Sequence, residues 1–142
     1  SRIKNDRPPL IFEDGEQTRD FIHVSDIARA NRLALEVESA VGEAINVGTG
    51  DPTSITELAE ELIRRYGKED ELAPDITNEF RSGDIRHCFA DTSRAKELLN
   101  FEAEVSLESG LDELVSWGLD SDATDNTDEA YSEMEEKGLI RD

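Results

Sequence analysis

The chain has 142 residues, of which 35 are acidic and 15 basic, giving a formal net charge of −20. A field of this sign repels nucleic acid and anionic membranes, so neither is expected as a partner. No apolar run approaches the roughly 20 residues of a membrane-spanning helix. One cysteine and two separated histidines exclude an internal disulfide and offer no metal-ligand spacing.

The acidity is spread along the chain. The segment from Asp120 onward has 9 acidic and 2 basic residues, which leaves a net charge of −13 for residues 1–119, and arginine (11) outnumbers lysine (4). Such a surface resembles those of proteins adapted to high intracellular salt, where a Debye length of about 3 Å screens self-repulsion. The hypothesis is halophilic adaptation, and the alternative is an ordinary acidic cytosolic protein. The single cysteine fits a cytoplasmic location.

In chain order, the first predicted feature is a turn between two apolar runs. Leu10–Glu13 is an extended segment, Asp14-Gly15 is a turn signal, and Thr18–Val24 has the pattern of a strand. This order predicts a hairpin-like return of the chain.

Arg19 lies at the start of the second of these strands. Its planar fork of donors matches phosphate oxygens, which indicates a ligand at the mouth of the loop. The alternative is a surface arginine paired with Asp14, Glu16 or Asp20.

Ser25 or Asp26 is expected to cap a helix over Ile27–Glu36. Glu43–Val47 has the pattern of a short parallel strand, which normally needs neighbours on a larger sheet. This strand and the absence of an initiating methionine lead us to expect a piece of a longer protein. The glycine-rich exit Gly48-Thr49-Gly50 follows the strand.

The clearest helix begins after Ser54, which forms a capping box with Glu57. Apolar residues recur at helical spacing as far as Tyr66, and Gly67 is expected to end the helix. Residues 68–84 are predicted to be a long loop with a short extended piece.

Two more helices are predicted, one capped by Asp91 or Thr92 and one that begins at Ser106 and ends at Gly118. Residues 121–127 have the composition of an acidic linker, and a marginal helix around Tyr131 would need a surface to dock on. The alternation of strands and helices indicates an α/β class, or α+β if the sequence is a fragment, with few short strands and about four helices.

A second basic cluster contains Arg81, Gly83 and Asp84. An arginine and a carboxylate beside a flexible glycine could bind a nucleotide, the arginine on the diphosphate and the carboxylate on ribose hydroxyls. The alternative is a solvated turn with an Arg81–Asp84 ion pair.

Four motifs in this order resemble those of the NAD-dependent sugar-nucleotide epimerase/dehydratase family, the extended short-chain dehydrogenases, over about residues 8–118. The first is D-G-x-Q-x-R-D-F-x-H/Y-V-x-D, matched by Asp14, Gly15, Gln17, Arg19, Asp20, Phe21, His23, Val24 and Asp26. The others are N-x-G-x-G at 46–50, R-x-G-D at 81–84 with A-D-x-S-K/R-A at 90–95, and S-L-E-S-G-L at 106–111, which resembles the family's S-L-E-E-G-L.

The resemblance implies a doubly wound dinucleotide-binding domain followed by a smaller substrate domain, with this chain as the C-terminal, substrate-binding portion (1–119) and an acidic segment (120–142). It implies that Arg19 and Arg81 contact the phosphates of a nucleotide-sugar and that Asp84 contacts its ribose. The intact parent would be an NAD-dependent enzyme, homodimeric, of the UDP-glucose 4-epimerase type. A dehydratase or decarboxylase of the same family is the alternative.

The chain departs from the family where the chemistry resides. It has no G-x-x-G-x-x-G loop and no Y-x-x-x-K pair, which in the family hold NAD and supply the base. We therefore expect no catalytic residue, no bound cofactor and weak or no nucleotide binding from this chain alone. His23 is interpreted as a packed, hydrogen-bonded residue, and Cys88 as a small buried one. A stand-alone binding or regulatory domain, and an acidic tail that binds a partner, are the remaining alternatives.

Overall fold

The computed structural model describes residues 1–141, which form two compact units. The first unit combines Ser1–Gln17, Ser54–Arg86 and the described residues from Leu111 onward. The second unit combines Thr18–Thr53 and His87–Gly110. Each unit is therefore assembled from segments that are far apart in the sequence.

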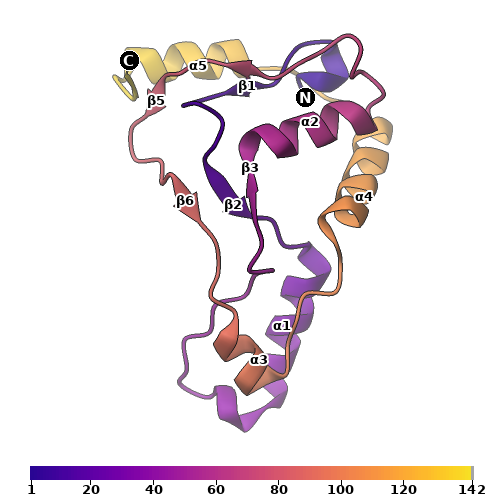
Figure 1. Cartoon of the computed structure of the whole chain (residues 1–142), viewed down its shortest axis with the longest axis vertical. Coiled ribbons are helices and arrows are strands. Elements are labelled where there is room, and N and C mark those ends of the chain that lie inside the picture. The colour runs from indigo at the N-terminus through magenta and orange to yellow at the C-terminus, as the bar shows by residue number, and fades with distance from the viewer. Residues whose placement is uncertain (142) are drawn as a thin grey trace. The chain divides into compact units, whose positions relative to one another are not determined.

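The first unit has two small sheets and several helices (Figure 1). Its elements are η1 (Ile3–Asn5), β1 (Leu10–Ile11), α2 (Ile55–Arg65), β4 (Asp75–Ile76), β5 (Phe80–Arg81), α5 (Thr127–Glu136) and β7 (Ile140–Arg141), together with most of α4 (Leu107–Asp120). β1 pairs in parallel with β4, and β5 pairs antiparallel with β7.

The second unit is built around a three-stranded sheet and a pair of helices. Its elements are β2 (Thr18–Asp20), α1 (Val24–Glu36), η2 (Glu38–Ala40), β3 (Pro52–Ser54), β6 (His87–Cys88) and α3 (Ser93–Leu99). The strand order is β3-β2-β6, and β2 and β6 run in parallel with Arg19 opposite Cys88.

The predicted capping box of α2 is confirmed. The Glu57 amide donates to Ser54 Oγ (3.1 Å), and the Ser54 amide donates to the Glu57 carboxylate (2.8 Å). Gly67 follows the helix with a φ of 66°, a left-handed conformation that glycine adopts without strain.

The predicted hairpin is wrong, because β1 and β2 belong to different sheets. The carbonyls of Gly15 and Gln17 instead accept the amides of Thr56 and Ile55 (3.1 and 3.0 Å). These are amides of the first turn of α2, which no carbonyl within the helix can satisfy. The turn therefore caps a helix instead of returning a strand.

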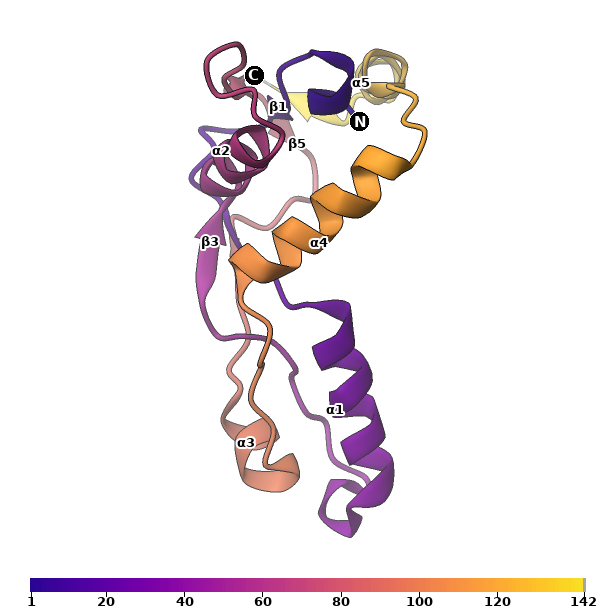
Figure 2. The same cartoon turned by 90° about the vertical axis from the view of Figure 1, so that its right-hand side faces the viewer.

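The core of the second unit lies between α1 and α3, which run side by side in both views (Figure 2). The buried members of this cluster are Ala30, Ala95, Leu99 and Phe101. The strand predicted at 43–47 is not formed within the described chain. Its apolar side chains Ile45 and Val47 pack against the cluster, which explains the apolar pattern without a strand partner.

The core of the first unit draws on all three of its segments; its buried apolar side chains are Ile3, Ile11, Ala59, Ile63, Leu111 and Val115. Gly118 does not end α4 as predicted, since the helix continues to Asp120. A methyl group at Gly118 would lie 2.4 Å from the Tyr66 hydroxyl oxygen, so this glycine makes room for a neighbouring side chain.

The predicted class is confirmed as mixed α/β with few short strands. Five α-helices occur among residues 1–141, against about four predicted, because the marginal C-terminal helix forms as α5. No helix in that range is both long and apolar enough to cross a bilayer.

Candidate functional site

Arg81 and Asp84, the two residues singled out in the R-x-G-D loop, form an ion pair in the first unit. Arg81 Nε and Nη2 donate to the two Asp84 carboxylate oxygens at 2.9 and 3.0 Å. The Arg81 guanidinium also lies 5.6 Å from the centre of the Phe12 ring. Both charged side chains remain accessible, at 46% and 29% exposed. The arginine is thus held in place while its charge can still be reached from solvent.

A second arginine, Arg86, anchors the same loop. Its guanidinium donates to both carboxylate oxygens of Asp14 (3.0 and 2.8 Å) and to Glu13 Oε2 (2.9 Å). The hydrogen bond from Arg86 is the main reason why the pKa of Asp14 falls to about 2. Sequence spacing assigns Arg86 no role, because it does not show which of the many carboxylates this arginine would meet.

Arg19 lies in the second unit as the middle residue of β2, which ends at Asp20 and is shorter than the strand predicted over residues 18–24, because α1 already begins at Val24. The side chain is half-buried, and Nη1 donates to the carbonyl of Thr18 at 2.8 Å. Arg19 lines a shallow depression of about 350 Å³ together with Asn46, Cys88 and Phe89. Cys88 is exposed, not buried as predicted, because it lies on β6 at the edge of the sheet.

The neighbouring Asp20 connects three of the motifs within the second unit. Its carboxylate accepts the amides of Thr49 (2.8 Å), Gly50 (3.0 Å) and Ala90 (3.1 Å), and also the Thr49 hydroxyl (2.6 Å). Burial opposes the charged form, but these hydrogen bonds outweigh it and lower the pKa of Asp20. The carboxylate is therefore a fixed structural anion.

The glycine-rich loop at residues 48–50 is not free to bind the phosphates of NAD. The amides of Thr49 and Gly50, which would bind such phosphates, already donate to Asp20. A methyl group at Gly48 would lie 2.4 Å from Asp20 Oδ2 and 2.6 Å from Ala90 Cβ, so the side of the loop is filled by protein. The loop at residues 48–50 therefore does not fit the phosphates of a dinucleotide.

The close approach at Gly48 makes a direct prediction. The change Gly48→Ala should lower the free energy of unfolding by about 2 kcal/mol, because Asp20 or Ala90 would have to shift. Gly42→Ala is the control, since nothing lies within 4 Å of that position and only its positive φ is strained, at a cost of about 1 kcal/mol. Urea unfolding of both variants checks this, and equal losses would show that the contact at Gly48 is unimportant.

Asp26, the last residue of the first motif, is buried at 2% exposure. Its carboxylate accepts the amides of Glu104 (3.0 Å) and Val105 (2.9 Å) and an Arg29 nitrogen (2.8 Å). Asp26 therefore holds a segment almost 80 residues away, just before α4. It does not cap α1 as predicted.

His23 caps α1 instead, since its Nδ1 accepts the Ser25 amide at 3.3 Å. Its predicted role as a packed, hydrogen-bonded residue agrees with the structure: a methyl group at Gly110 would lie 3.3 Å from its ring. Across the described part of the chain, no cluster of three or more acidic, histidine or cysteine residues could hold a metal ion.

The sequence model of the family described as GDP-mannose 4,6 dehydratase matches residues 1–114. The chain belongs to the NAD-dependent sugar-nucleotide epimerase/dehydratase family. A putative UDP-glucose 4-epimerase of Methanocaldococcus jannaschii is 36% identical over 115 residues, which are 81% of this chain and 35% of that protein.

Two solved structures of family members are similar to this one. The UDP-glucose 4-epimerase of Thermotoga maritima with UDP-glucose has a TM-score of 0.75 and 37% identity, over 84% of this chain and 37% of that chain. The UDP-glucuronic acid 4-epimerase of Bacillus cereus with UDP-glucuronic acid and NAD has a TM-score of 0.65 and 34% identity, over 78% and 34%.

This chain spans about a third of the length of the curated family members that it matches. Within it, three acidic or histidine residues of the first family motif, Asp20, His23 and Asp26, have structural partners in the second unit. The R-x-G-D residues Arg81 and Asp84 instead pair with each other at an accessible place in the first unit.

Proposed function

We propose that this chain is the nucleotide-sugar-binding portion of an NAD-dependent epimerase of the UDP-glucose 4-epimerase type. The observation that carries the proposal is the accessible Arg81–Asp84 pair beside the Phe12 ring. The relative from Thermotoga maritima is a complex with UDP-glucose, which supports a uridine nucleotide as the ligand.

In this proposal the two partners of the ion pair, Arg81 and Asp84, bind different groups of the ligand. Arg81 turns its fork of donors from the Asp84 carboxylate to the diphosphate, which matches it in geometry and charge. Asp84 then accepts hydrogen bonds from the ribose hydroxyls. For Arg19, which lies in the second unit, we propose a role in contacting the phosphates of a nucleotide-sugar, as the family resemblance implies.

In this proposal the reaction at the sugar is carried out by parts of the parent enzyme that lie outside this chain. NAD would supply the oxidation and reduction of the sugar there, and the residues of this chain would bind and orient the nucleotide end. Anchoring the part of the substrate that does not react is how such a portion contributes to the rate. We propose that the parent is homodimeric and cytoplasmic, and that this portion comprises residues 1–119.

Titration of the chain with UDP in molar KCl, followed by NMR chemical shifts, tests the role of Arg81. We expect weak binding, with Kd on the order of 1 mM. Arg81→Ala should weaken it about tenfold, an estimate kept low because the arginine is about half exposed.

Arg64→Ala is the matched control, because Arg64 also pairs with an acid three positions away, lies in the same unit and is exposed. It removes the same charge, so it reports the loss of general electrostatic attraction. Equal affinities of the two variants would refute the assignment of Arg81.

The nucleotide and the reaction are tested separately. We expect UDP to bind more tightly than GDP, although the description of the matched family names a GDP-sugar enzyme. The chain alone, given NAD and UDP-glucose, should produce no UDP-galactose. Preference for GDP or dTDP would favour the dehydratase alternative, and turnover by the chain alone would overturn the division of roles proposed above.

A further inference from the structure

The segment after Asp120 lies outside the family match, which ends at residue 114. The sequence predicted an acidic linker and a marginal helix here. In the structure this C-terminal segment (residues 121–141) holds α5 and β7, and among its contacts with the rest of the first unit are an ionic one and a backbone one.

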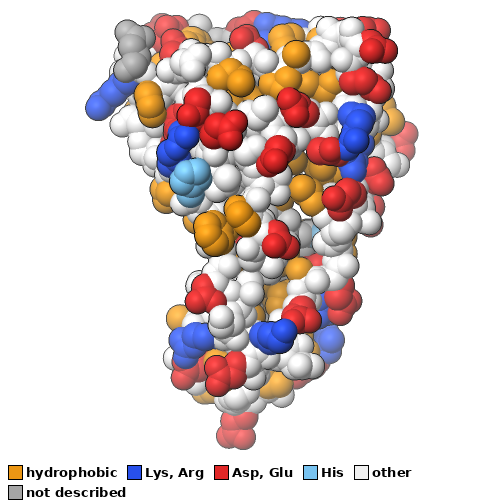
Figure 3. Space-filling view, in the orientation of Figure 1, with side chains coloured by type: hydrophobic (Ala, Val, Ile, Leu, Met, Phe, Trp, Pro, Cys, Tyr) orange, Lys and Arg blue, Asp and Glu red, His pale blue; other side chains and the backbone are white. Residues whose placement is uncertain are grey.

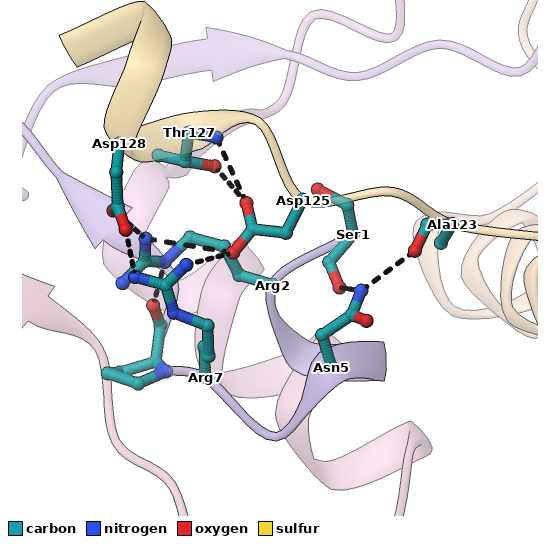
Figure 4. Close-up of polar contacts among 9 residues, drawn as sticks. Ser1, Arg2, Asn5, Arg7, Ala123, Asp125, Thr127 and Asp128 are labelled. Carbon is teal, nitrogen blue, oxygen red and sulfur yellow. Dashed lines mark hydrogen bonds and ion pairs between the residues drawn. The ribbon is translucent and has the colours of Figure 1, made fainter. Parts of the chain in front are cut away.

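The first contact is ionic and lies at the start of α5 (Figure 4). Arg7 donates to Asp125 (2.8 Å) and Asp128 (2.5 Å), and Arg2 donates to Asp128 (3.2 Å). The Asp125 side chain is only 6% exposed, and its other oxygen accepts the Thr127 hydroxyl (2.6 Å). The arginines near the N-terminus thus fix where α5 begins.

The second contact is made by the backbone of β7. Ile140 lies opposite Arg81 in the antiparallel pair of β7 with β5. The Ser82 amide donates to the Leu139 carbonyl at 2.7 Å. The main chain that carries Arg81 is therefore hydrogen-bonded to the C-terminal segment.

Tyr131 of α5 makes a third contact, which reaches the surroundings of the Arg81 side chain. Its ring stacks on Phe12, with centroids 6.1 Å apart and planes 9° from parallel, and Phe12 is the ring beside which the Arg81 guanidinium lies. The Tyr131 hydroxyl also donates to the carboxylate of Glu79, two residues before Arg81.

We propose that Tyr131 and β7 are positioning elements that keep the strand and the guanidinium of Arg81 within reach of the ligand. Tyr131 acts through Phe12 and Glu79, and β7 acts through the backbone of β5. The inference rests on the proposed function, since it assigns these elements to the same site. It gives the acidic segment a role within its own chain, where the sequence predicted a linker and offered a partner-binding tail as the alternative.

Two measurements on the full chain test the proposal. Hydrogen exchange of the ligand-free protein reports the order of residues 79–86, and titration with UDP reports its consequence. Tyr131→Leu keeps an apolar side chain but loses the ring and the hydroxyl. It should speed exchange in residues 79–86 by about tenfold or somewhat less and weaken UDP binding by about threefold or more. Tyr131→Phe, which retains the ring, should restore most of the UDP affinity.

Ser132→Ala, at the next and exposed position of α5, is the neutral control and should match the wild type in both measurements. If Tyr131→Leu does not fold, a chain that ends at Leu139 removes the residues of β7 that pair with β5, and it should show the same two changes. Wild-type exchange in residues 79–86 in the folded variant would overturn the proposal.

The outcomes also separate this inference from the proposed function. If Arg81→Ala weakens UDP binding but Tyr131→Leu and the shortened chain do not, the positioning role is wrong and the binding role stands. If Arg81→Ala has no effect beyond that of Arg64→Ala, the proposed function fails, whatever hydrogen exchange shows.

Discussion

Asp26→Asn is expected to lower the free energy of unfolding by about 3 kcal/mol. The wild-type carboxylate accepts two backbone amides on one oxygen and Arg29 on the other. An asparagine amide must direct its NH₂ group either at the backbone amides or at the guanidinium. At 2% exposure water cannot relieve this opposition of donors. Thermal or urea unfolding measures the loss.

The matched control is Glu104→Gln, because Glu104 pairs with the same arginine (3.3 Å) but is 73% exposed. Its effect should stay below about 1 kcal/mol. If Asp26→Asn costs no more than this control, the buried carboxylate does not anchor the segment before α4.

Asp26 also makes the stability of the fold depend on pH in the acid range. Burial opposes ionisation of Asp26, but the Val105 amide, Arg29 and the Glu104 amide outweigh it and lower its pKa below the ordinary 3.8. A lowered folded-state pKa gives stability that is fully present above the unfolded value and is lost as pH falls through the folded one. The wild type should therefore lose stability below about pH 4 more steeply than Asp26→Asn does.

The melting temperature of the wild type is expected to rise on the order of 10 °C between dilute buffer and molar KCl, equivalent to about 3 kcal/mol. The net charge of −20 leaves many carboxylates without a basic neighbour, and acidic side chains are spread over the face drawn in Figure 3. Salt screens their mutual repulsion, while exposed ion pairs such as Arg64–Glu61 lose little, because they contribute little.

A variant with reduced charge provides the control. Glu69→Lys, Glu97→Lys and Glu136→Lys change three exposed acids, and since each adds two units, the net charge moves from −20 to −14. Its melting temperature should respond less steeply to KCl. A flat or falling response of the wild type would exclude the halophilic hypothesis.

The features predicted well from sequence are those that depend on neighbours in the chain. The capping box of Ser54 and Glu57 is such a case, because both partners lie within one turn of helix. Motif spacing also identified the family from residues alone. Local spacing also offered the Arg81–Asp84 ion pair, as the alternative to a nucleotide contact, and this pair is formed.

The features that sequence reasoning missed depend on distant partners. The Asp14-Gly15 turn looked like a hairpin because nothing local shows that β1 pairs with residues 75–76. Asp26 had the spacing of a helix cap, yet its partners lie almost 80 residues away. The helix around Tyr131 was predicted to be marginal because the ring that stacks on Tyr131 belongs to Phe12, far away in the sequence.

The order of segments in the two units has a consequence for synthesis. The second unit has all of its residues once position 110 has been made, whereas the first unit still lacks most of α4 and all of α5 and β7. At translation rates of about 5–20 residues per second, this interval lasts on the order of seconds. Until it ends, β5 has an open edge beside Arg81, and the nascent chain offers that edge to other strands. Residues 140–141 close this edge when they pair with β5.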